Sequence, residues 1–459
     1  MIYKITAIFC LSTVLWACSK SSEKPISDIP ANFRSSTSSY QLVAKLPYTA
    51  WWQQFKDPLL NQLIQDGLNS NRDIEVALGH LQEAKGMLKE VKLSWIPTVQ
   101  LWAGYSTNPA LGVPGSFYAA WPTYTLNILQ LYAQQKQATF NMMYYQAAVE
   151  GVRLTVIGQI AGAYFTLMAQ SEQLRLLQQL DGDLNELIRL SQKDLAIGLA
   201  DELTIAQLQS DEQLVRSQML PVQQNKVASE NALRYLLNKN PGAVANKNNF
   251  ASIDFGRIKP GSLPAAVLNN RPDMRMAWYA LKAAHANVLS AYSTFFPIMQ
   301  LDDFIGEIDA PKQELAQAVD SYGIVNLALS NLGRIDASKG KQAAALAEFQ
   351  KTIKRILKEV DTDYEANKQK NQQYLDYKKA LKLYEKKYTL QVELFNTGLI
   401  SYKDLLQSKI YLDNLALAVN LAKLELALSL VLLYQDLAGG YAHQNHLEKN
   451  KLNKHADNK

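Results

Sequence analysis

Residues 395–406 read Phe-Asn-Thr-Gly-Leu-Ile-Ser-Tyr-Lys-Asp-Leu-Leu, and they decide the fold. This stretch separates two long helical patterns, at about residues 334–395 and 402–437. Gly398 can adopt the left-handed backbone conformation that ends a helix, and Ser401 can cap the helix that follows. The pattern predicts an antiparallel helical hairpin with Gly398 at its tip.

The chain contains a second tip of the same kind. Residues 195–203 read Leu-Ala-Ile-Gly-Leu-Ala-Asp-Glu-Leu, which places Gly198 and Leu199 200 residues before Gly398 and Leu399. Two further pairs of segments match at about the same offset: 71–74 with 270–274, and 94–97 with 294–297. Similarity at one fixed offset is the mark of an internal repeat, so we expect a duplicated unit.

Each unit has the same order of parts. A proline, Pro97 or Pro297, ends a first helical segment, and a region with the period of β-strands follows. A helical run of about 60 residues comes next, and after it the tip and a return helix. The first repeat (51–240) is predicted to hold strands at about 98–107 and 116–128 and long helices at about 132–197 and 201–237. The second repeat (241–441) is predicted to hold strands at about 298–308 and 321–330 and long helices at about 334–395 and 402–437.

The predicted strands have the length that a tilted strand needs to cross a bilayer, about 9–11 residues. We find no apolar stretch of about 18 residues outside the N-terminal segment and therefore expect no transmembrane helix. Four strands cannot close a barrel, and lipid does not tolerate open sheet edges. Three copies of the chain would supply twelve strands, which predicts a homotrimer with a shared barrel.

The N-terminus has the features of a targeting segment. Residues 1–17 combine a basic residue, an apolar run and the small residue Ala17 before Cys18. This resembles a bacterial lipoprotein signal, which implies cleavage before Cys18 and a covalent lipid on it; a plain secretory signal is the alternative. Residues 18–50 are predicted to be a lipid-anchored tether and residues 442–459 a disordered polar tail.

Composition excludes several function classes. The 47 basic and 42 acidic residues give a net charge of only +5, which does not favour nucleic-acid binding. The five histidines show no ligand spacing with cysteine or carboxylate, and no nucleophile–base pattern or phosphate loop stands out. We therefore expect neither an enzyme nor a metal site, and no cofactor beyond the lipid.

The motifs resemble those of the TolC/OprM-like outer-membrane factors, in particular the efflux lipoproteins of the NodT family. The similarity runs from about Trp51 to Tyr441 and rests on five elements in order. These are the opening segment 51–64, the element 271–274 (Arg-Pro-Asp-Met), the aromatic-proline segment 295–297, the junction 332–334 and the glycine-rich segment 437–441.

This resemblance implies a fold, a location and partners. The fold would be mainly α with membrane β: a trimeric twelve-stranded outer-membrane barrel continuous with a twelve-helix periplasmic barrel. The chain would be a passive exit duct in the outer membrane of a Gram-negative bacterium. Its partners would be a periplasmic adaptor protein, an inner-membrane pump of the RND type and outer-membrane lipids.

The resemblance also assigns roles to individual residues. Gly198, Leu199, Gly398 and Leu399 match the tips where the adaptor docks in this family. Asp404 matches an acidic position of the periplasmic aperture, and three copies would form a ring of carboxylates. Gln407 and Thr204 stand where many relatives carry further aspartates, so the resemblance implies a less acidic aperture here.

Two alternatives to small-molecule efflux stay open. The same fold serves as the outer-membrane channel of type I-like protein or peptide secretion systems. A coiled-coil lipoprotein without a pore is a second alternative, but bilayer-length strand pairs would have no use in it.

Overall fold

The computed structural model describes residues 34–35, 50–107, 115–244, 250–255, 271–309, 312–325 and 327–437. The chain divides into two units, residues 1–31 and 32–459, and every described residue belongs to the second. The signal segment, Cys18, most of the tether and the polar tail therefore lie outside the described residues, as does most of the glycine-rich segment 437–441.

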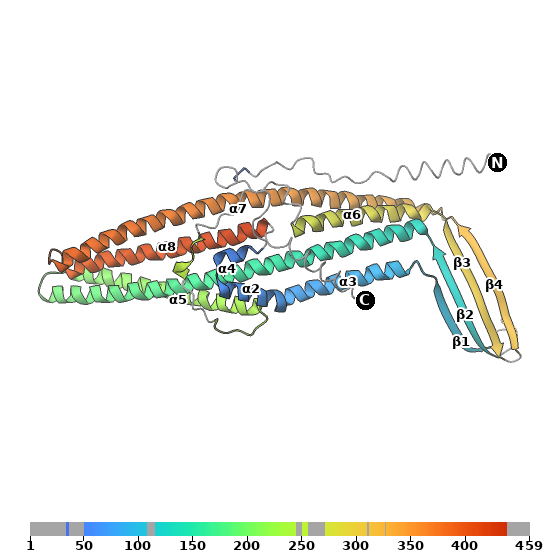
Figure 1. Ribbon diagram of the computed structural model, residues 1–459, viewed down its shortest axis with the longest axis horizontal. Helices are drawn as coiled ribbons and strands as arrows, with labels where there is room; N and C mark the ends of the chain where they lie inside the picture. Colours follow the sequence, from blue (N-terminus) through green and yellow to red (C-terminus); the bar gives the residue numbers. More distant parts are fainter. Residues whose placement is uncertain are drawn as a thin grey trace. The chain divides into compact units, whose positions relative to one another are not determined.

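Two helical hairpins form the long part of the fold (Figure 1). In the first, α4 (Ile128–Ala196) turns back into α5 (Glu202–Leu236); in the second, α7 (Ser330–Asn396) turns back into α8 (Tyr402–Asp436). At 1.5 Å per residue, the 69 residues of α4 span about 100 Å. The four predicted long helices are confirmed, and each ends within one residue of the predicted position. The helix α5 runs through Pro221 as one element.

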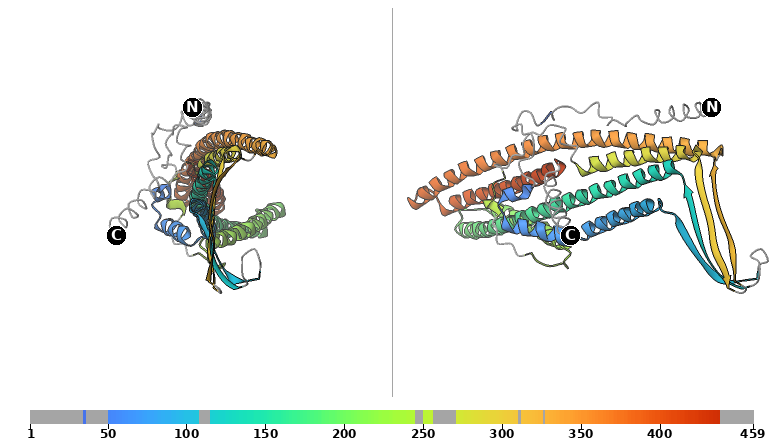
Figure 2. Two further views of the ribbon diagram at one scale, coloured as in Figure 1. Left: turned by 90° about the vertical axis from the view of Figure 1, so that its right-hand side faces the viewer. Right: turned by 45° about the vertical axis from the view of Figure 1, so that its right-hand side comes forward.

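Shorter helices open each repeat. The first repeat begins with η1 (Trp51–Phe55), α2 (Pro58–Ser70) and α3 (Arg72–Leu93). The second begins with η3 (Phe250–Ser252), α6 (Pro272–Tyr292) and η6 (Ser293–Phe295). Both views of Figure 2 place α6 beside α7, and both α3 and α6 pack against α4. The helices α3 and α6 begin where the return helices α5 and α8 end.

The strands form one antiparallel sheet in the order β1-β2-β3-β4. They are β1 (Thr98–Ser106), β2 (Gly115–Leu126), β3 (Ile298–Asp309) and β4 (Lys312–Ile324). The repeats meet at the centre of the sheet, where Thr125 of β2 pairs with Gln300 of β3. Two hairpins, one from each repeat, therefore make the sheet, and β1 and β4 form its edges.

The position of the fourth strand corrects the sequence-based expectation. The predicted strand was 321–330, but β4 occupies Lys312–Ile324. Asp309, the last residue of β3, pairs directly with Lys312, so β4 begins there. Residues 312–318 (Lys-Gln-Glu-Leu-Ala-Gln-Ala) have a helical composition, and pairing with β3 overrides this local preference.

Two helices also begin earlier than predicted. α4 begins at Ile128 rather than 132, because the Asn127 side chain caps it by accepting from the Gln130 amide at 3.0 Å. The Asn127 amide nitrogen also donates to the carbonyl oxygen of Ser293 at 2.9 Å, which ties the start of α4 to the end of the α6 segment. α7 begins at Ser330 rather than 334.

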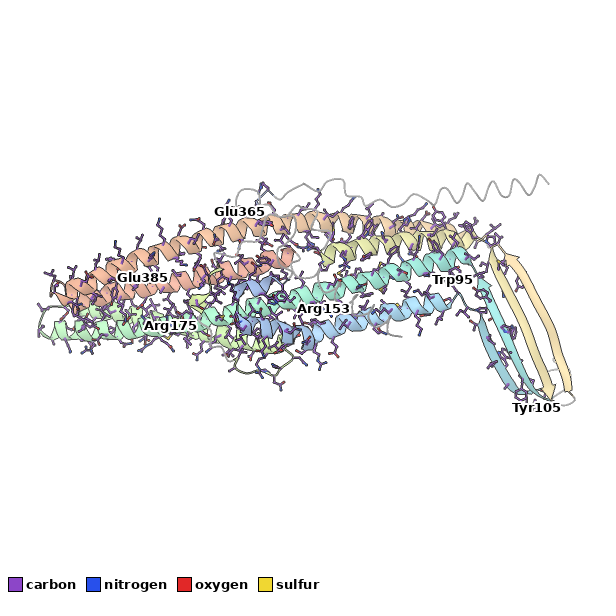
Figure 3. All side chains as sticks on the ribbon, viewed as in Figure 1. Trp95, Tyr105, Arg153, Arg175, Glu365 and Glu385 are labelled. Carbon is purple, nitrogen blue, oxygen red and sulfur yellow. The ribbon has the colours of Figure 1, made fainter. Side chains whose placement is uncertain are left out.

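Aromatic side chains fix the junction between helices and sheet. Trp95 lies where α3 leads into β1, and Tyr105 lies near the other end of that strand (Figure 3). The Trp95 indole donates to the Gln135 side chain at 3.0 Å, and its carbonyl accepts from the Tyr124 hydroxyl at 2.9 Å. These contacts join the end of α3 to α4 and to β2.

The main hydrophobic core lies where the openings of both repeats meet the middle of α4 and the end of α8. Trp51 stacks on Tyr434 with ring centroids 5.3 Å apart. Phe55 and Phe255, 200 residues apart in the sequence, meet edge to face at 5.4 Å, and both contact Phe165. The duplicated segments thus pack into one core, and such aromatic pairs add to the free energy of burial.

From the sequence we found no apolar stretch long enough for a transmembrane helix, and the helices α4 and α8 correct this statement. By length and composition alone, α4 and α8 each contain an 18-residue window apolar enough to span a membrane. In the structure, 61% of the window in α4 and 44% of the window in α8 are buried. Helices that pack inside a protein pass the same test, so composition does not separate a membrane span from a bundle helix here.

Candidate functional site

The tip of the second hairpin has the geometry that its sequence predicted. Gly398 has φ = 76°, in the left-handed region, and the Leu399 amide donates to the Leu394 carbonyl at 2.9 Å. This bond closes the end of α7. Ser401 then caps α8 through a capping box, in which its hydroxyl accepts from the Asp404 amide and the Asp404 carboxylate accepts from the Ser401 amide.

The tip of the first hairpin repeats this geometry. Gly198 also has φ = 76°, and the Leu199 amide donates to the Asp194 carbonyl at 2.8 Å. Asp201 caps α5 by accepting from the Thr204 amide at 2.7 Å. Equal backbone angles at positions 200 residues apart show that the duplicated sequence encodes one local structure twice.

Each tip presents a leucine to solvent in this chain. Leu199 is 75% exposed and Leu399 is 72% exposed. An ion pair between the Lys403 ammonium and the Asp194 carboxylate, at 2.9 Å, joins the two tips. The sequence analysis did not single out either partner. The signal that could have found them is their opposite charge, four residues before one tip glycine and five after the other.

Asp404 lies on the first turn of α8 and is exposed in this chain. Its carboxylate accepts from the Ser401 hydroxyl at 2.6 Å, and this hydrogen bond holds the pKa of Asp404 below its usual value. A depressed carboxyl pKa means that the charge is present at neutral pH and is lost only as the pH falls through the lowered value. Asp404 therefore has a second role that the sequence did not reveal, as part of a helix cap.

The helix joints are built from equivalent positions of the two repeats. In the first repeat, the Asn71 side chain donates to the Leu236 carbonyl at the end of α5, at 3.0 Å, and also caps α3. In the second repeat, Arg271 donates to the equivalent carbonyl, that of Asp436, at the end of α8. These bonds satisfy carbonyl groups that a helix end leaves without partners. Each return helix is thereby continued by a shorter helix.

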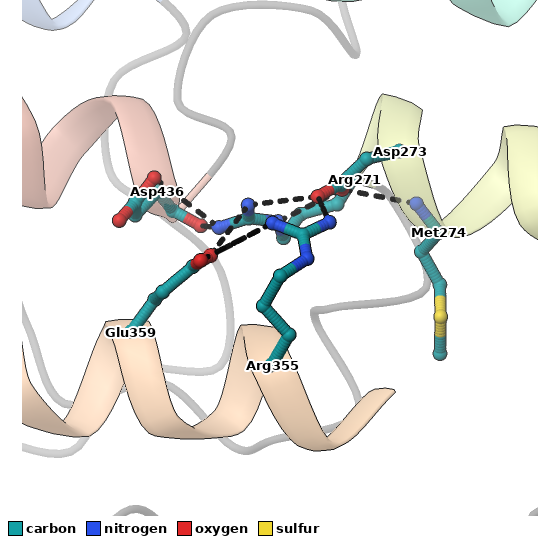
Figure 4. A network of polar contacts seen from close by, with 6 residues as sticks. All are labelled: Arg271, Asp273, Met274, Arg355, Glu359 and Asp436. Atoms are coloured by element: carbon teal, nitrogen blue, oxygen red, sulfur yellow. Dashed lines mark hydrogen bonds and ion pairs between the residues drawn. The ribbon is translucent and has the colours of Figure 1, made fainter. Parts of the chain in front are cut away.

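A polar network surrounds the second joint (Figure 4). The Arg271 guanidinium makes two bonds to the Asp273 carboxylate, both at 3.0 Å, and approaches Asp436 at 3.5 Å and Glu359 at 3.8 Å. Arg355 also binds Asp273, at 3.0 Å, and pairs with Glu359. The segment 271–274, which the sequence singled out only by resemblance, thus joins three helices.

The pKa values of two carboxyl groups in this network are shifted in opposite directions. Burial works to raise the pKa of Asp273, but Arg271 and Arg355 outweigh it, so that pKa lies below its usual value. Asp363 lies beside Asp436 on the same network, and burial, reinforced by Asp436, raises the pKa of Asp363 to about 8. Within the part of the chain that the structure describes, no group of three or more His, Cys, Asp or Glu residues could hold a metal ion.

Comparison with known proteins finds relatives among outer membrane efflux proteins. Residues 63–239 match the family model described as outer membrane efflux protein. The chain is 24% identical over 415 residues to the Probable efflux pump outer membrane protein TtgC of Pseudomonas putida, covering 86% of each chain. It is also 24% identical over 430 residues to the Cation efflux system protein CusC of Escherichia coli, covering 87% of this chain and 92% of that protein.

Solved structures show the same fold. The open state of the MtrE outer membrane channel of Neisseria gonorrhoeae matches with a TM-score of 0.78 at 20% identity, covering 92% of this chain and 97% of that one. The CmeC outer membrane channel of Campylobacter jejuni matches with a TM-score of 0.75 at 20% identity, covering 92% and 94%. The mainly helical fold with membrane strands, expected from the sequence, is confirmed. The chain therefore has the fold of these outer membrane channels and, over residues 63–239, similarity to outer membrane efflux proteins.

Proposed function

We propose that this chain is the outer-membrane channel of a tripartite efflux system, acting as a passive exit duct made of three copies. It would carry small molecules from an inner-membrane pump and a periplasmic adaptor to the outside of the cell. The match to outer membrane efflux proteins over residues 63–239 supports this function, and so do the relatives, which are named as efflux components.

The observation that carries the proposal is the sheet. Its four strands have 9, 12, 12 and 13 residues, and within the described part of the chain β1 and β4 are edges without a partner strand. Strands of this length can cross a bilayer when tilted, but an open edge in lipid leaves backbone groups unpaired. Pairing β1 of one copy with β4 of the next would remove every edge, and three copies would give twelve strands.

An apolar stripe on α8 supports the same assembly. Tyr411, Leu421, Leu428 and Leu432 are exposed in the single chain. From Ala418 through Glu425 to Leu432 the positions step by 3 and 4, as in a coiled-coil seam, and Tyr411 lies one heptad before Ala418. Leucine side chains left in water lose the free energy of burial, about 1.5–3 kcal/mol for each side chain. A neighbouring copy that covered the stripe would recover this free energy of burial.

The two tips are the proposed docking surface for the adaptor. Gly198, Leu199, Gly398 and Leu399 lie at the same end of the hairpins, as the ion pair between Lys403 and Asp194 requires. The exposed leucines would provide apolar contacts for a partner helix. We assign the pump to the RND type, on the resemblance of the sequence motifs.

Asp404 is the proposed acidic residue of the periplasmic aperture. It follows the second tip by one turn and keeps its charge at neutral pH. In three copies it would form a ring that attracts cations and repels anions.

A lipid on Cys18 is the proposed anchor. The segment 15–18 (Leu-Trp-Ala-Cys) supports it, since a small residue before the cysteine is the pattern of a lipoprotein signal. Loss of labelled palmitate from a Cys18→Ser variant would check it, and labelling that persisted would rule out this anchor. The names of the relatives favour small-molecule efflux over protein or peptide secretion.

The central test is the assembly and its conductance. Protein purified in detergent should be trimeric by light scattering and should conduct ions in a planar lipid bilayer. A stable monomer, or a trimer without conductance, would contradict the proposed duct.

A further inference from the structure

The seam between the two hairpins carries a pair of buried carboxyl groups. Asp183 lies on α4, in the first hairpin, and Asp413 lies on α8, in the second. Asp183 precedes Asp194, the tip ion-pair partner, by 11 residues, or about three helical turns. The pair therefore lies at a polar contact between the hairpins that is separate from the contact at the tips.

The polar partners of this pair are too few for two full negative charges. Lys409 on α8 donates to Asp183 Oδ1 at 2.7 Å, and Gln179 on α4 donates to Asp413 Oδ1 at 2.9 Å. The second oxygen of each carboxyl, Oδ2, is buried without a hydrogen-bond partner. Asp413 is only 4% exposed, so water does not readily supply the missing bonds.

One proton shared by the two carboxyl groups would give the buried Oδ2 atoms a hydrogen bond. Lys409, one helical turn before Asp413, donates to Asp183, and Gln179, one turn before Asp183, donates to Asp413, so the two carboxyl groups face each other across the seam. A protonated carboxyl can donate to an ionised one, which satisfies the buried oxygens and leaves one negative charge opposite Lys409. Without that proton, two carboxylates would face each other across the seam and repel.

We propose that Asp183 and Asp413 share one proton below neutral pH, and that this proton latches the two hairpins together along the α4–α8 seam. Its loss at higher pH weakens the seam and favours separation of the hairpins. The proton is a property of the folded chain; its effect on gating rests on the proposed function as a duct.

Electrostatics at the seam support this assignment. Burial raises the pKa of Asp413 to about 7, and the Asp183 carboxyl acts in the same direction. Burial works to lower the pKa of Lys409, but Asp183 and Asp413 outweigh it, so that pKa lies above its usual value. Lys409 therefore stays charged while the carboxyl pair titrates.

Three other ionisable groups face the pair from α4, α7 and α8. Arg175 on α4 approaches Asp413 but binds Glu172 directly, with a pKa raised by that bond. Burial raises the pKa of Tyr388 on α7, which keeps that phenol neutral. Tyr402 at the start of α8 also faces this cluster through Tyr388. The carboxyl pair is the group whose charge changes between acid and neutral pH.

The sign of the pH dependence follows from linkage. An aspartate released from the seam has an ordinary pKa near 3.8, whereas the pKa of Asp413 in the seam is about 7. Between these values the latched arrangement binds a proton that the separated one has lost, so raising the pH favours separation. Between these two pKa values, one proton changes the ratio of latched to separated hairpins by about tenfold per pH unit. Above the higher pKa value, a further rise in pH does not change this ratio.

The first experiment detects the protonated carboxyl group directly. Infrared difference spectra of the full-length protein, titrated from pH 5 to 8, should show a protonated carboxyl band that is lost with an apparent pKa of about 7. Asp413→Asn should remove this band, while the contribution of Asp363 persists in both proteins. Asp211→Asn on α5, which changes an aspartate outside the seam, is the matched control and should leave the band unchanged.

A second experiment measures whether the shared proton holds the two hairpins together. The midpoint of thermal unfolding of the wild type should fall as the pH rises from 5 to 7, and this slope should be reduced in Asp413→Asn and Asp183→Asn but not in Asp211→Asn. Channel opening in planar bilayers should rise over the same range in the wild type and be flatter in the two seam variants.

The outcomes separate the shared proton from the proposed function. If the wild type lacks a protonated carboxyl component with an apparent pKa of about 7, or if that component survives in Asp413→Asn, the shared proton is overturned. A band with identical pH profiles of unfolding in the wild type and both seam variants overturns the latch. A protein that shows the band and the slope but never conducts contradicts the duct and leaves the shared proton supported.

Discussion

At the residue scale, two side chains carry more than one role. Asp404 was predicted from a family pattern as an aperture residue, and the structure shows it inside a capping box with Ser401. Arg271 was noticed as part of a motif, and the structure shows it as the centre of a joint between α6, α7 and α8. Sequence patterns located both residues without revealing these contacts.

The two roles of Asp404 can be separated by a pair of variants. Asp404→Ala should lower cation selectivity or raise conductance, because it removes both the charge and half of the capping box. Ser401→Ala removes the other half, at a cost of about 1 kcal/mol in stability, but keeps the charge. Reversal potentials in a salt gradient measure the selectivity. Equal selectivity in both variants and the wild type would remove Asp404 from the aperture.

Arg271 should matter more for stability than an exposed arginine nearby. Arg271→Leu leaves the Asp273 carboxylate short of a partner and the Asp436 carbonyl unpaired, which should cost roughly 3 kcal/mol. Arg72→Leu breaks only an exposed pair with Glu75 and should cost less than about 1 kcal/mol. Denaturant unfolding of the purified protein compares them, and equal losses would contradict a structural role for the joint.

At the element scale, duplication explains why two tips share one structure. Both glycines have φ = 76°, and a Cβ at either would meet nothing within 4 Å, so only the backbone restricts substitution. A residue that avoids the left-handed region would strain the turn by roughly 1–2 kcal/mol. A charged residue at Gly398 would therefore combine two effects, and a cleaner test changes its neighbour.

Leu399→Glu should abolish efflux without loss of trimer, because it places a charge on the exposed apolar tip while keeping the turn. Gly398→Asn is the matched control, since asparagine tolerates the left-handed conformation and adds no charge. Drug susceptibility of cells and the amount of trimer in the membrane are the measurements. If Leu399→Glu leaves susceptibility unchanged, the adaptor does not depend on that tip.

At the scale of the whole molecule, the exposed stripe on α8 and the open sheet edges both require a second surface. Leu432→Asp should weaken the trimer, because it puts a charge where a neighbouring copy would bury a leucine. Lys386→Asp, a charged change at an exposed position of α7 outside this stripe, is the control. Native gels and light scattering report the trimer fraction. A trimer as stable as the wild type would show that this stripe is not at the interface.

Local sequence determined the elements whose signals are local. Gly198, Gly398, Pro97 and Pro297 restrict the backbone at their own positions, so the helix ends could be read directly from the sequence. The repeat fixed their order, because equal sequence at one offset encodes equal structure twice. These features predicted two hairpins, two strand pairs and the family.

Tertiary structure decided what depends on residues far apart in the sequence. β4 begins at Lys312 because β3 pairs with it, although its own residues favour a helix. Arg271 meets Asp436 only when helices distant in the sequence pack together, and the same holds for Asp183 and Asp413. The spacing of these residues in the sequence therefore does not predict the contacts. The sequence by itself thus determined where the chain turns, and the packing of α4, α7 and α8 decided which charges meet, because burial and pairing exist only in the folded chain.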